Sequence, residues 1–524
     1  MNPFQQIAPI LNVCILTAFA AALYSARREI SKDTGAIRRD EWLAVTLALA
    51  AAITMQSFCE LKHLVYIDEF WYLEAGKNIL RYGMAPGFGK SIGWPVLVTF
   101  SYIFGGISNY APIALNLLFG AALVPLVYLS ARALSRDHVI AAVASFTLAL
   151  LPYRAVWSAT AETAVSALFF ILCGVYLSLL YYRSGSSRAM LAAAASIAAA
   201  AQIRPECLMF LGLFWFGRRI LSAPGGRKDT LLFYAALLTA AAINLPNFSI
   251  FAAFQSSTNW LETDSFGQIK GASISLKNLW FNTKRWAPKF FDLSLHGGLF
   301  TALYLSGAAI AFKRARRELA FAAFWAGMLY CFYFSTWFHV YGTTTELFPK
   351  TKLFLFFYPA LGILAGYAVS YLLKTGRAGT RSALILAVCA LGWNAAYIPR
   401  AGFKDAARAL ETGLLANLPE TTPESCMIIT NAPVMVNASG FFRTAYAPHF
   451  TADDGYAANL LAGESCLLYL DDITNDLGVK EFNEADRSIK AKYRLRERVN
   501  FSLRGKTYRL LTVIKPAAQP RPKI

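Results

Sequence analysis

Residues 66–83 read YIDEFWYLEAGKNILRYG and place two adjacent carboxylates, Asp68 and Glu69, close after an apolar run. That run, residues 42–58, is near the length that crosses a bilayer, so the acidic pair lies where the chain leaves a membrane. Asp68 could simply cap the helix that follows, as a solvated residue. Alternatively, the pair faces a cavity at the membrane surface, where one carboxylate is a general base and the other orients it or binds a cation.

The composition predicts a multi-pass membrane protein. The chain has 524 residues, of which 56% are hydrophobic and 15% are charged, and its mean hydropathy is +0.42. Apolar runs of near-spanning length predict an all-α polytopic protein with about 12 transmembrane helices. The predicted spans are 7–25, 42–58, 112–131, 138–153, 161–182, 189–203, 206–220, 230–250, 297–312, 318–337, 352–373 and 382–398.

The basic residues predict the orientation of these spans. Arg27, Arg28, the run KRARR (313–317) and Lys374 lie in short loops, which the positive-inside bias assigns to the cytoplasm. This bias explains the net charge of +19 better than nucleic-acid binding does. The N-terminus is then outside, in a bacterial inner membrane. The outer, periplasmic loops are 59–93, 251–296 and 338–351.

One short apolar segment does not fit this count. GWPVLVTFSYIFGG (93–106) has Pro95 near its start, and a full crossing would reverse the orientation of every later span. We therefore expect a partly inserted or re-entrant helix, shielded by protein.

The composition changes after residue 400, which predicts a membrane domain over 1–400 and a small α/β domain over 401–524 on the periplasmic side. SCMIIT (425–430) and CLLYLDD (466–472) are typical of buried strands, and 493–515 predicts a β-hairpin. Cys426 and Cys466 each begin a predicted strand. In an oxidising compartment we expect these two thiols to form a disulfide.

The stretch 68–83 resembles the first outer loop of the GT-C membrane glycosyltransferases, of the protein O-mannosyltransferase and aminoarabinose-transferase type. In that family an Asp-Glu pair is followed at fixed spacing by a tyrosine, a small residue, a leucine and a glycine. The residues at these positions here are Tyr72, Gly76, Leu80 and Gly83. The resemblance continues in order over about residues 55–370, through Glu162, the Arg-Pro-Glu turn at 204–206 and the aromatic, proline-containing helix at 351–367.

The resemblance implies a sugar donor linked to a polyprenyl phosphate and a hydroxyl acceptor on a lipid, glycan or protein. Asp68 would accept the hydroxyl proton as the acceptor attacks the anomeric carbon with inversion, and Glu69 and Glu162 are the other candidate catalytic acids. Cations must stabilise the phosphate leaving group. The candidate phosphate-binding residues are Lys90, Arg204, Lys350 and Lys352. The candidate substrate-binding residues are Tyr72, Glu206, His339 and Glu346.

Structural alternatives stay open for several of these residues. Lys350 and Lys352 could snorkel to the interface, and Arg204 with Glu206 could be a structural ion pair. Two carboxylates could hold Mg²⁺ or Mn²⁺, but lysine and arginine can serve a phosphate without a metal, so no cofactor is firmly implied.

Three other functions also remain open. They are a carrier or flippase of lipid-linked sugars, an oligosaccharyltransferase of the same architecture, and a non-catalytic scaffold. A carrier usually shows repeated halves and midplane sites, and no such repeat is evident in the sequence.

Overall fold

The computed structural model describes residues 4–59, 67–85, 88, 90–108, 110–221, 227–247, 249–250, 276–286, 298–335, 353–382, 385, 389, 418, 422–423, 425–431, 436, 443–471, 480–503 and 506–514. The chain divides into two units, residues 1–61 with 78–402 and residues 62–77 with 403–524. The predicted outer loops 251–296 and 338–351 and the predicted span 382–398 lie largely outside the described residues.

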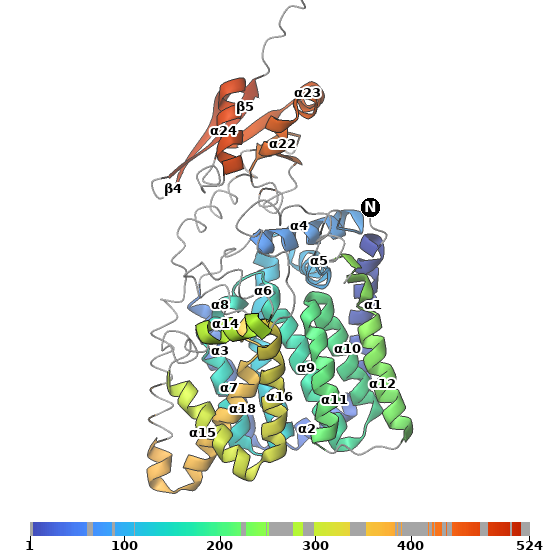
Figure 1. Cartoon of the computed structure of the whole chain (residues 1–524), viewed down its shortest axis with the longest axis vertical. Coiled ribbons are helices and arrows are strands. Elements are labelled where there is room, and N and C mark those ends of the chain that lie inside the picture. Colours follow the sequence, from blue (N-terminus) through green and yellow to red (C-terminus); the bar gives the residue numbers. More distant parts are fainter. Residues whose placement is uncertain are drawn as a thin grey trace, which may run out of the picture. The chain divides into compact units, whose positions relative to one another are not determined.

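The first unit is helical, and Figure 1 shows its long helices as a bundle. Its helices are α1 (Phe4–Ser25), α2 (Arg27–Gly35), α3 (Arg39–Ser57), α5 (Gly93–Gly105), α6 (Tyr110–Ser135), α7 (His138–Ala149), α8 (Pro152–Ser158), α9 (Thr163–Ser184), α10 (Ser187–Ile203), η1 (Pro205–Met209), α11 (Phe210–Ile220), α12 (Arg227–Ala242), α14 (Leu276–Trp286), α15 (Gly298–Arg314), α16 (Arg316–Ser335) and α18 (Tyr358–Lys374). Helix α4 (Ile67–Tyr82) crosses the division between the two units.

Within the described residues, five helices are long and apolar enough to cross a membrane, and the pair α7 and α8 would add a sixth, broken span. Together with the shorter apolar helices, they confirm a polytopic helical membrane protein. Two predicted spans differ in detail. Residues 138–153 do not form one straight helix, because α7 and α8 meet at an angle of 57° just before Pro152. A proline ring is tolerated in the first turn of a helix but not in its interior, and Pro152 accordingly begins α8. Residues 206–220 contain the short helix η1 and the 11-residue α11.

Helix α5 covers the segment that was expected to be partly inserted. It has 13 residues, fewer than the roughly 20 that span a bilayer, and it packs against α1, α6 and α10. Its first residue, Gly93, lies so close to α10 that a Cβ atom there would come 2.5 Å from the carbonyl carbon of Gln202. Glycine therefore allows α5 to begin directly against the end of α10.

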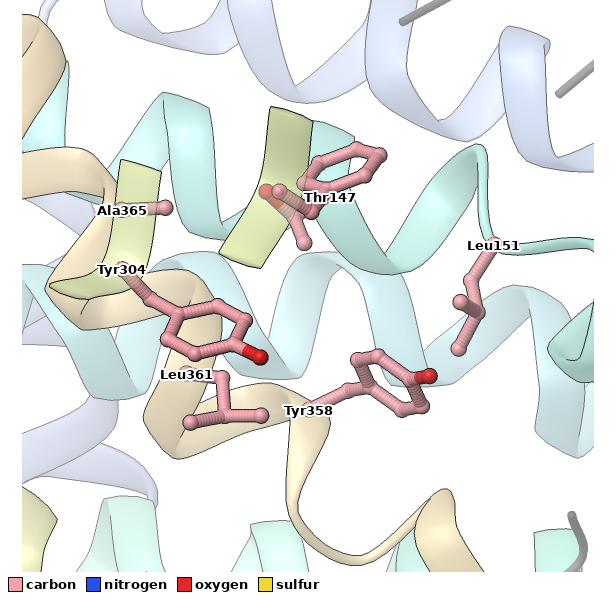
Figure 2. Close-up of a pocket in the computed structure, with 7 residues that line it drawn as sticks. Thr147, Leu151, Tyr304, Tyr358, Leu361 and Ala365 are labelled. Atoms are coloured by element: carbon pink, nitrogen blue, oxygen red, sulfur yellow. The ribbon is translucent and has the colours of Figure 1, made fainter. Parts of the chain in front are cut away.

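Helices α7, α15 and α18 pack together in the same unit and enclose a small apolar cavity. Figure 2 shows Thr147 and Leu151 from the α7 side, Tyr304 of α15 and Tyr358 of α18 around this space. The Tyr304 hydroxyl donates to, or accepts from, the hydroxyl of Thr301 at 3.0 Å. The cavity is too small and too apolar to be the centre of a polar reaction.

The second unit contains a five-stranded sheet, which confirms the predicted small α/β domain. Its strands are β1 (Met427–Thr430), β2 (Arg443–Tyr446), β3 (Leu467–Asp471), β4 (Arg494–Leu503) and β5 (Lys506–Ile514), in the order β2-β1-β3-β5-β4. Strands β1, β2 and β3 are parallel, and β4 and β5 form the predicted antiparallel hairpin. The helices of this unit are α22 (Ala447–Ala452), α23 (Asp454–Gly463) and α24 (Lys480–Lys492). Cys426 and Cys466, immediately before β1 and β3, are joined by a disulfide.

Candidate active site

Helix α4 carries the acidic pair and buries one side. Glu69, Tyr72, Leu73, Gly76 and Lys77 follow the spacing i, i+3, i+4, i+7, i+8, and all five are buried. Glu69 is 0% exposed, so a carboxylate lies on the buried face together with a lysine. The backbone of Asp68 lies in the first turn of α4, while its side chain is outside the described part of the chain.

Lys77 is an unusual lysine, because burial lowers its pKa to about 8 even though the Glu74 carboxylate favours the charged form. Buried ionisable groups are costly to keep and occur most often at functional sites or in structural ion pairs. The buried face of α4, with an acid and a base two turns apart, is therefore a candidate functional surface.

A second group of polar residues surrounds the turn before α9. The carboxylate of Glu162, 1% exposed, accepts a hydrogen bond from the backbone N–H of Thr163 at 3.3 Å and so caps the N-terminus of α9. The side-chain amide of Asn116, from α6, donates to the carbonyl oxygens of Thr160 and Glu162, both at 2.8 Å. A single buried asparagine thus fixes the turn that positions Glu162.

The same turn is held from a second side by α5. The indole N–H of Trp94 donates to the carbonyl oxygen of Ala161 at 2.7 Å, and Trp94 is fully buried. The helix that was expected to be partly inserted therefore supports the turn carrying Glu162.

Arg204 lies beside this turn, at the break between α10 and η1. Its Nε donates to the carboxylate of Glu206 at 2.7 Å, its Nη1 donates to the Thr163 hydroxyl at 3.3 Å, and its guanidinium lies 5.8 Å from the ring centre of Phe356. Pro205 occupies the first turn of η1, where its missing N–H costs nothing. The fold thus brings Arg204 into contact with Thr163, the residue after Glu162, and the ion pair with Glu206 considered in the sequence analysis is present.

Behind Arg204 lies a buried network of amide side chains centred on Gln202. Its Oε1 accepts from Asn12 at 2.8 Å and also from Asn247, and its Nε2 donates to Asn244 Oδ1 at 2.8 Å. Asn247 Oδ1 in turn accepts from the backbone N–H of Ile92 at 3.4 Å, directly before α5. The network connects α1, α10, the end of α12 and the start of α5, and so fixes the backbone on which Arg204 is carried.

The remaining candidates divide into two groups. Lys90 is half-buried shortly before α5. Four candidates lie outside the described residues: His339, Glu346, Lys350 and Lys352. In the part of the chain that the structure describes, no group of three or more His, Cys, Asp or Glu side chains could hold a metal ion.

The sequence analysis did not select Asn116, Thr163 or Gln202. A signal for two of them was available, since Asn116 and Gln202 are uncharged polar residues inside strongly apolar runs, where polar groups are expensive unless they are bonded or used.

Comparison with known proteins identifies the fold. Residues 64–218 match the family model described as dolichyl-phosphate-mannose-protein mannosyltransferase. ArnT from Cupriavidus metallidurans, in a crystal structure with undecaprenyl phosphate, has 15% sequence identity and a TM-score of 0.58, and the match covers 92% of this chain and 100% of that one. The archaeal oligosaccharyltransferase AglB from Archaeoglobus fulgidus, in complex with an inhibitory peptide and a dolichol-phosphate, has 12% identity and a TM-score of 0.55, covering 90% and 74%. No curated protein sequence matches the chain.

These similarities establish the fold of the chain. The chain has the GT-C fold of multi-pass membrane glycosyltransferases, as the resemblance of residues 68–83 predicted. Within that class it is similar to the ArnT and O-mannosyltransferase type.

Proposed function

We propose that this protein is a membrane glycosyltransferase that moves a sugar from a polyprenyl-phosphate donor to a hydroxyl acceptor, with inversion, at the periplasmic face of a bacterial inner membrane. The observation that carries this proposal is the buried face of α4, which keeps Glu69 and Lys77 out of solvent next to Asp68 in a GT-C fold. Buried charges that served only stability would be better replaced by apolar residues.

In the proposed reaction, the acceptor oxygen forms a bond with the anomeric carbon while the bond from that carbon to the phosphate oxygen breaks. The acceptor proton goes to the carboxylate of Asp68, and the electron pair of the broken bond leaves with the polyprenyl phosphate. Glu69 orients this base or binds a cation. A correctly placed general base contributes about 10²–10⁴-fold to such a rate.

Arg204 is the best supported candidate for binding the departing phosphate. The carboxylate of Glu206 holds the guanidinium in one orientation, and the Arg204 side chain is 14% exposed, so it is not sealed inside the protein. A guanidinium held in this way can stabilise developing phosphate charge without reorganising. Lys90, Lys350 and Lys352 are proposed as further cations, Glu162 as the second acid, and Tyr72, His339 and Glu346 as contacts to the sugar or the acceptor.

The test uses the full-length protein in nanodiscs with a polyprenyl-phosphate sugar and a panel of lipid and glycan acceptors. We expect Asp68→Asn to lower turnover by at least 100-fold and Glu69→Gln to lower it by a smaller factor. Arg81→Gln, which removes an exposed charge near the end of the same helix, should leave turnover within about threefold of the wild type. Full activity of Asp68→Asn would refute the assigned base. A chelator added to the wild-type protein would establish whether a divalent cation takes part.

An oligosaccharyltransferase is the second candidate, because two archaeal oligosaccharyltransferase structures share the fold. One of them is matched over 67% of its length, whereas the ArnT chain bound to undecaprenyl phosphate is matched over 100%. The agreement in length favours transfer of a single sugar. Comparison of monosaccharide and oligosaccharide donors with the same lipid would separate these functions.

A further inference from the structure

The basic end of the helix bundle contains two kinds of arginine. In the first kind the charge is neutralised by buried carboxylates: Arg132 pairs with Glu41 at 3.0 Å, and Arg183 pairs with Asp33 at 3.0 Å. In the second kind the guanidinium stacks on an aromatic ring, and examples are Arg27 on Tyr24 at 3.8 Å and Arg314 on Tyr371 at 4.8 Å. Stacking supports the side chain but leaves its charge uncompensated.

The last turn of α11 carries two arginines of the second kind, Arg218 and Arg219. The Arg219 guanidinium lies 4.5 Å from the ring centre of Trp215, and that of Arg218 lies 5.2 Å from Phe233. Arg218 Nη2 also donates to the hydroxyl of Thr230 at 2.8 Å. Among the described residues, neither arginine forms an ion pair with a carboxylate. Two adjacent guanidinium groups are thus held in place by neutral partners.

The charge of the surrounding sequence reinforces this pair. Between residues 216 and 230 there are four basic residues and one acidic residue, Asp229, which gives a formal charge of +3. By the positive-inside bias this turn is cytoplasmic, where anionic lipids give the membrane surface a negative potential.

The surface next to this turn is apolar and faces outward. Leu231 is 63% exposed and Leu238 is 70% exposed on α12, and Phe216 of α11 is also exposed. Only 17% of the spanning window that includes α12 is buried by the protein, and α12 lies at the edge of the helix bundle in Figure 1. In a multi-pass membrane protein such a surface is covered by acyl chains, so the headgroups of the same lipids lie at the level of Arg218 and Arg219.

We propose that the last turn of α11 binds the headgroup of an anionic phospholipid from the inner leaflet. Arg218 and Arg219 hold its phosphate, and the outward-facing side chains of α12 contact its acyl chains. This inference does not rest on the proposed transferase activity, because the site uses none of the candidate catalytic or donor-binding residues.

The experiment measures lipid retention by native mass spectrometry on the full-length protein in detergent, without donor or acceptor. Phosphatidylglycerol and phosphatidylcholine with identical acyl chains are added in separate titrations. Each basic residue near a membrane surface contributes on the order of 1 kcal/mol to binding anionic lipid, so Arg218→Gln with Arg219→Gln should weaken phosphatidylglycerol binding about tenfold to thirtyfold. Binding of phosphatidylcholine should change little.

Two further variants make the outcome specific. Arg377→Gln removes one exposed charge after α18, at the same end of the bundle, and should retain wild-type binding. Arg218→Lys with Arg219→Lys keeps both charges and should recover most of the binding, which also shows that loss in the glutamine variant does not come from misfolding. Three results would each overturn the proposal. They are wild-type phosphatidylglycerol binding by the glutamine double variant, an equal loss of binding in Arg377→Gln, and displacement of the lipid by millimolar inorganic phosphate.

Discussion

The amide network around Gln202 makes a quantitative prediction about stability. Leucine is close to glutamine in size, so Gln202→Leu removes the hydrogen bonds without opening a large cavity. Four hydrogen bonds of the Gln202 side chain are lost: those from Asn12 and Asn247, and those to Asn244 and the carbonyl of Ile243. Interhelical hydrogen bonds in membrane proteins contribute about 0.6 kcal/mol each on average and about 1.7 kcal/mol at most. The variant should therefore lose about 2 kcal/mol of unfolding free energy, with an upper limit of about 7 kcal/mol.

The assay is reversible unfolding in mixed micelles by a denaturing detergent, followed by far-ultraviolet circular dichroism. Thr239→Val is the matched control, because the exposed hydroxyl of Thr239 donates only to the carbonyl of Ala235 in its own helix, at 2.8 Å. We expect this control to change the unfolding free energy by less than about 0.5 kcal/mol. Equal stability of Gln202→Leu and Thr239→Val would refute the reasoning.

A double-mutant cycle sharpens the same prediction. Asn12→Leu removes one partner of Gln202 from α1. Since the two residues share a hydrogen bond, the double variant should lose less free energy than the two single variants lose together, by about 0.5–2 kcal/mol. Strict additivity would mean that the amides do not act as one network.

Three other changes have defined outcomes. Asn116→Leu should lower stability by about 2 kcal/mol, measured in the same mixed micelles, because it removes two hydrogen bonds to the turn before α9. Asp137→Ala should lower the melting temperature and make it depend less on acidic pH. Burial raises the pKa of Asp137, but hydrogen bonds from Ser370, Lys374 and two backbone N–H groups lower it by more, so the folded pKa lies below the usual value. The stability that the Asp137 carboxylate contributes is therefore present above about pH 4 and is lost as the pH falls through the folded pKa. Reduction of the Cys426–Cys466 disulfide, which joins residues 40 apart, should destabilise the sheet by at most about 4 kcal/mol, detected as faster proteolysis of the C-terminal residues.

The sequence predicted the helical membrane class and four of the five described strands because these depend on local patterns, but it did not predict β2. Runs of apolar residues report spans, and the short apolar runs after residue 425 report strands that are buried on both faces. The hairpin at β4 and β5 is also local in sequence. The bend between α7 and α8 was missed because Pro152 lies near the end of a run that otherwise continues with apolar residues.

The contacts that build the candidate site could not be predicted in the same way. Asn12 and Gln202 are 190 residues apart in the chain, and Asn116 reaches backbone carbonyls more than 40 residues away. A hydrophobic pattern reports which side of a helix is apolar, but it does not say which neighbouring helix lies against it. The composition of each run could have marked Asn116 and Gln202 as unusual, yet it could not have named their partners.

Arg154 and Arg204 show how the surroundings separate a structural role from a proposed functional one. Arg154 is 0% exposed and donates to the carbonyl oxygens of Gly120, Ala52 and Ala149, at 2.9–3.1 Å. It therefore satisfies backbone carbonyls of α3 and α6 and that of Ala149 at the end of α7, where the helix breaks and its last carbonyls lose their partners. Arg204 also lies at a helix break, but its donors meet side chains, the Glu206 carboxylate and the Thr163 hydroxyl, and its guanidinium is partly exposed. An arginine can give up side-chain partners to bind a ligand at a lower free-energy cost than it can give up helix carbonyls. The carbonyls would be left buried without a hydrogen bond. For this reason we propose Arg204, and not Arg154, as the arginine that binds the phosphate of the donor.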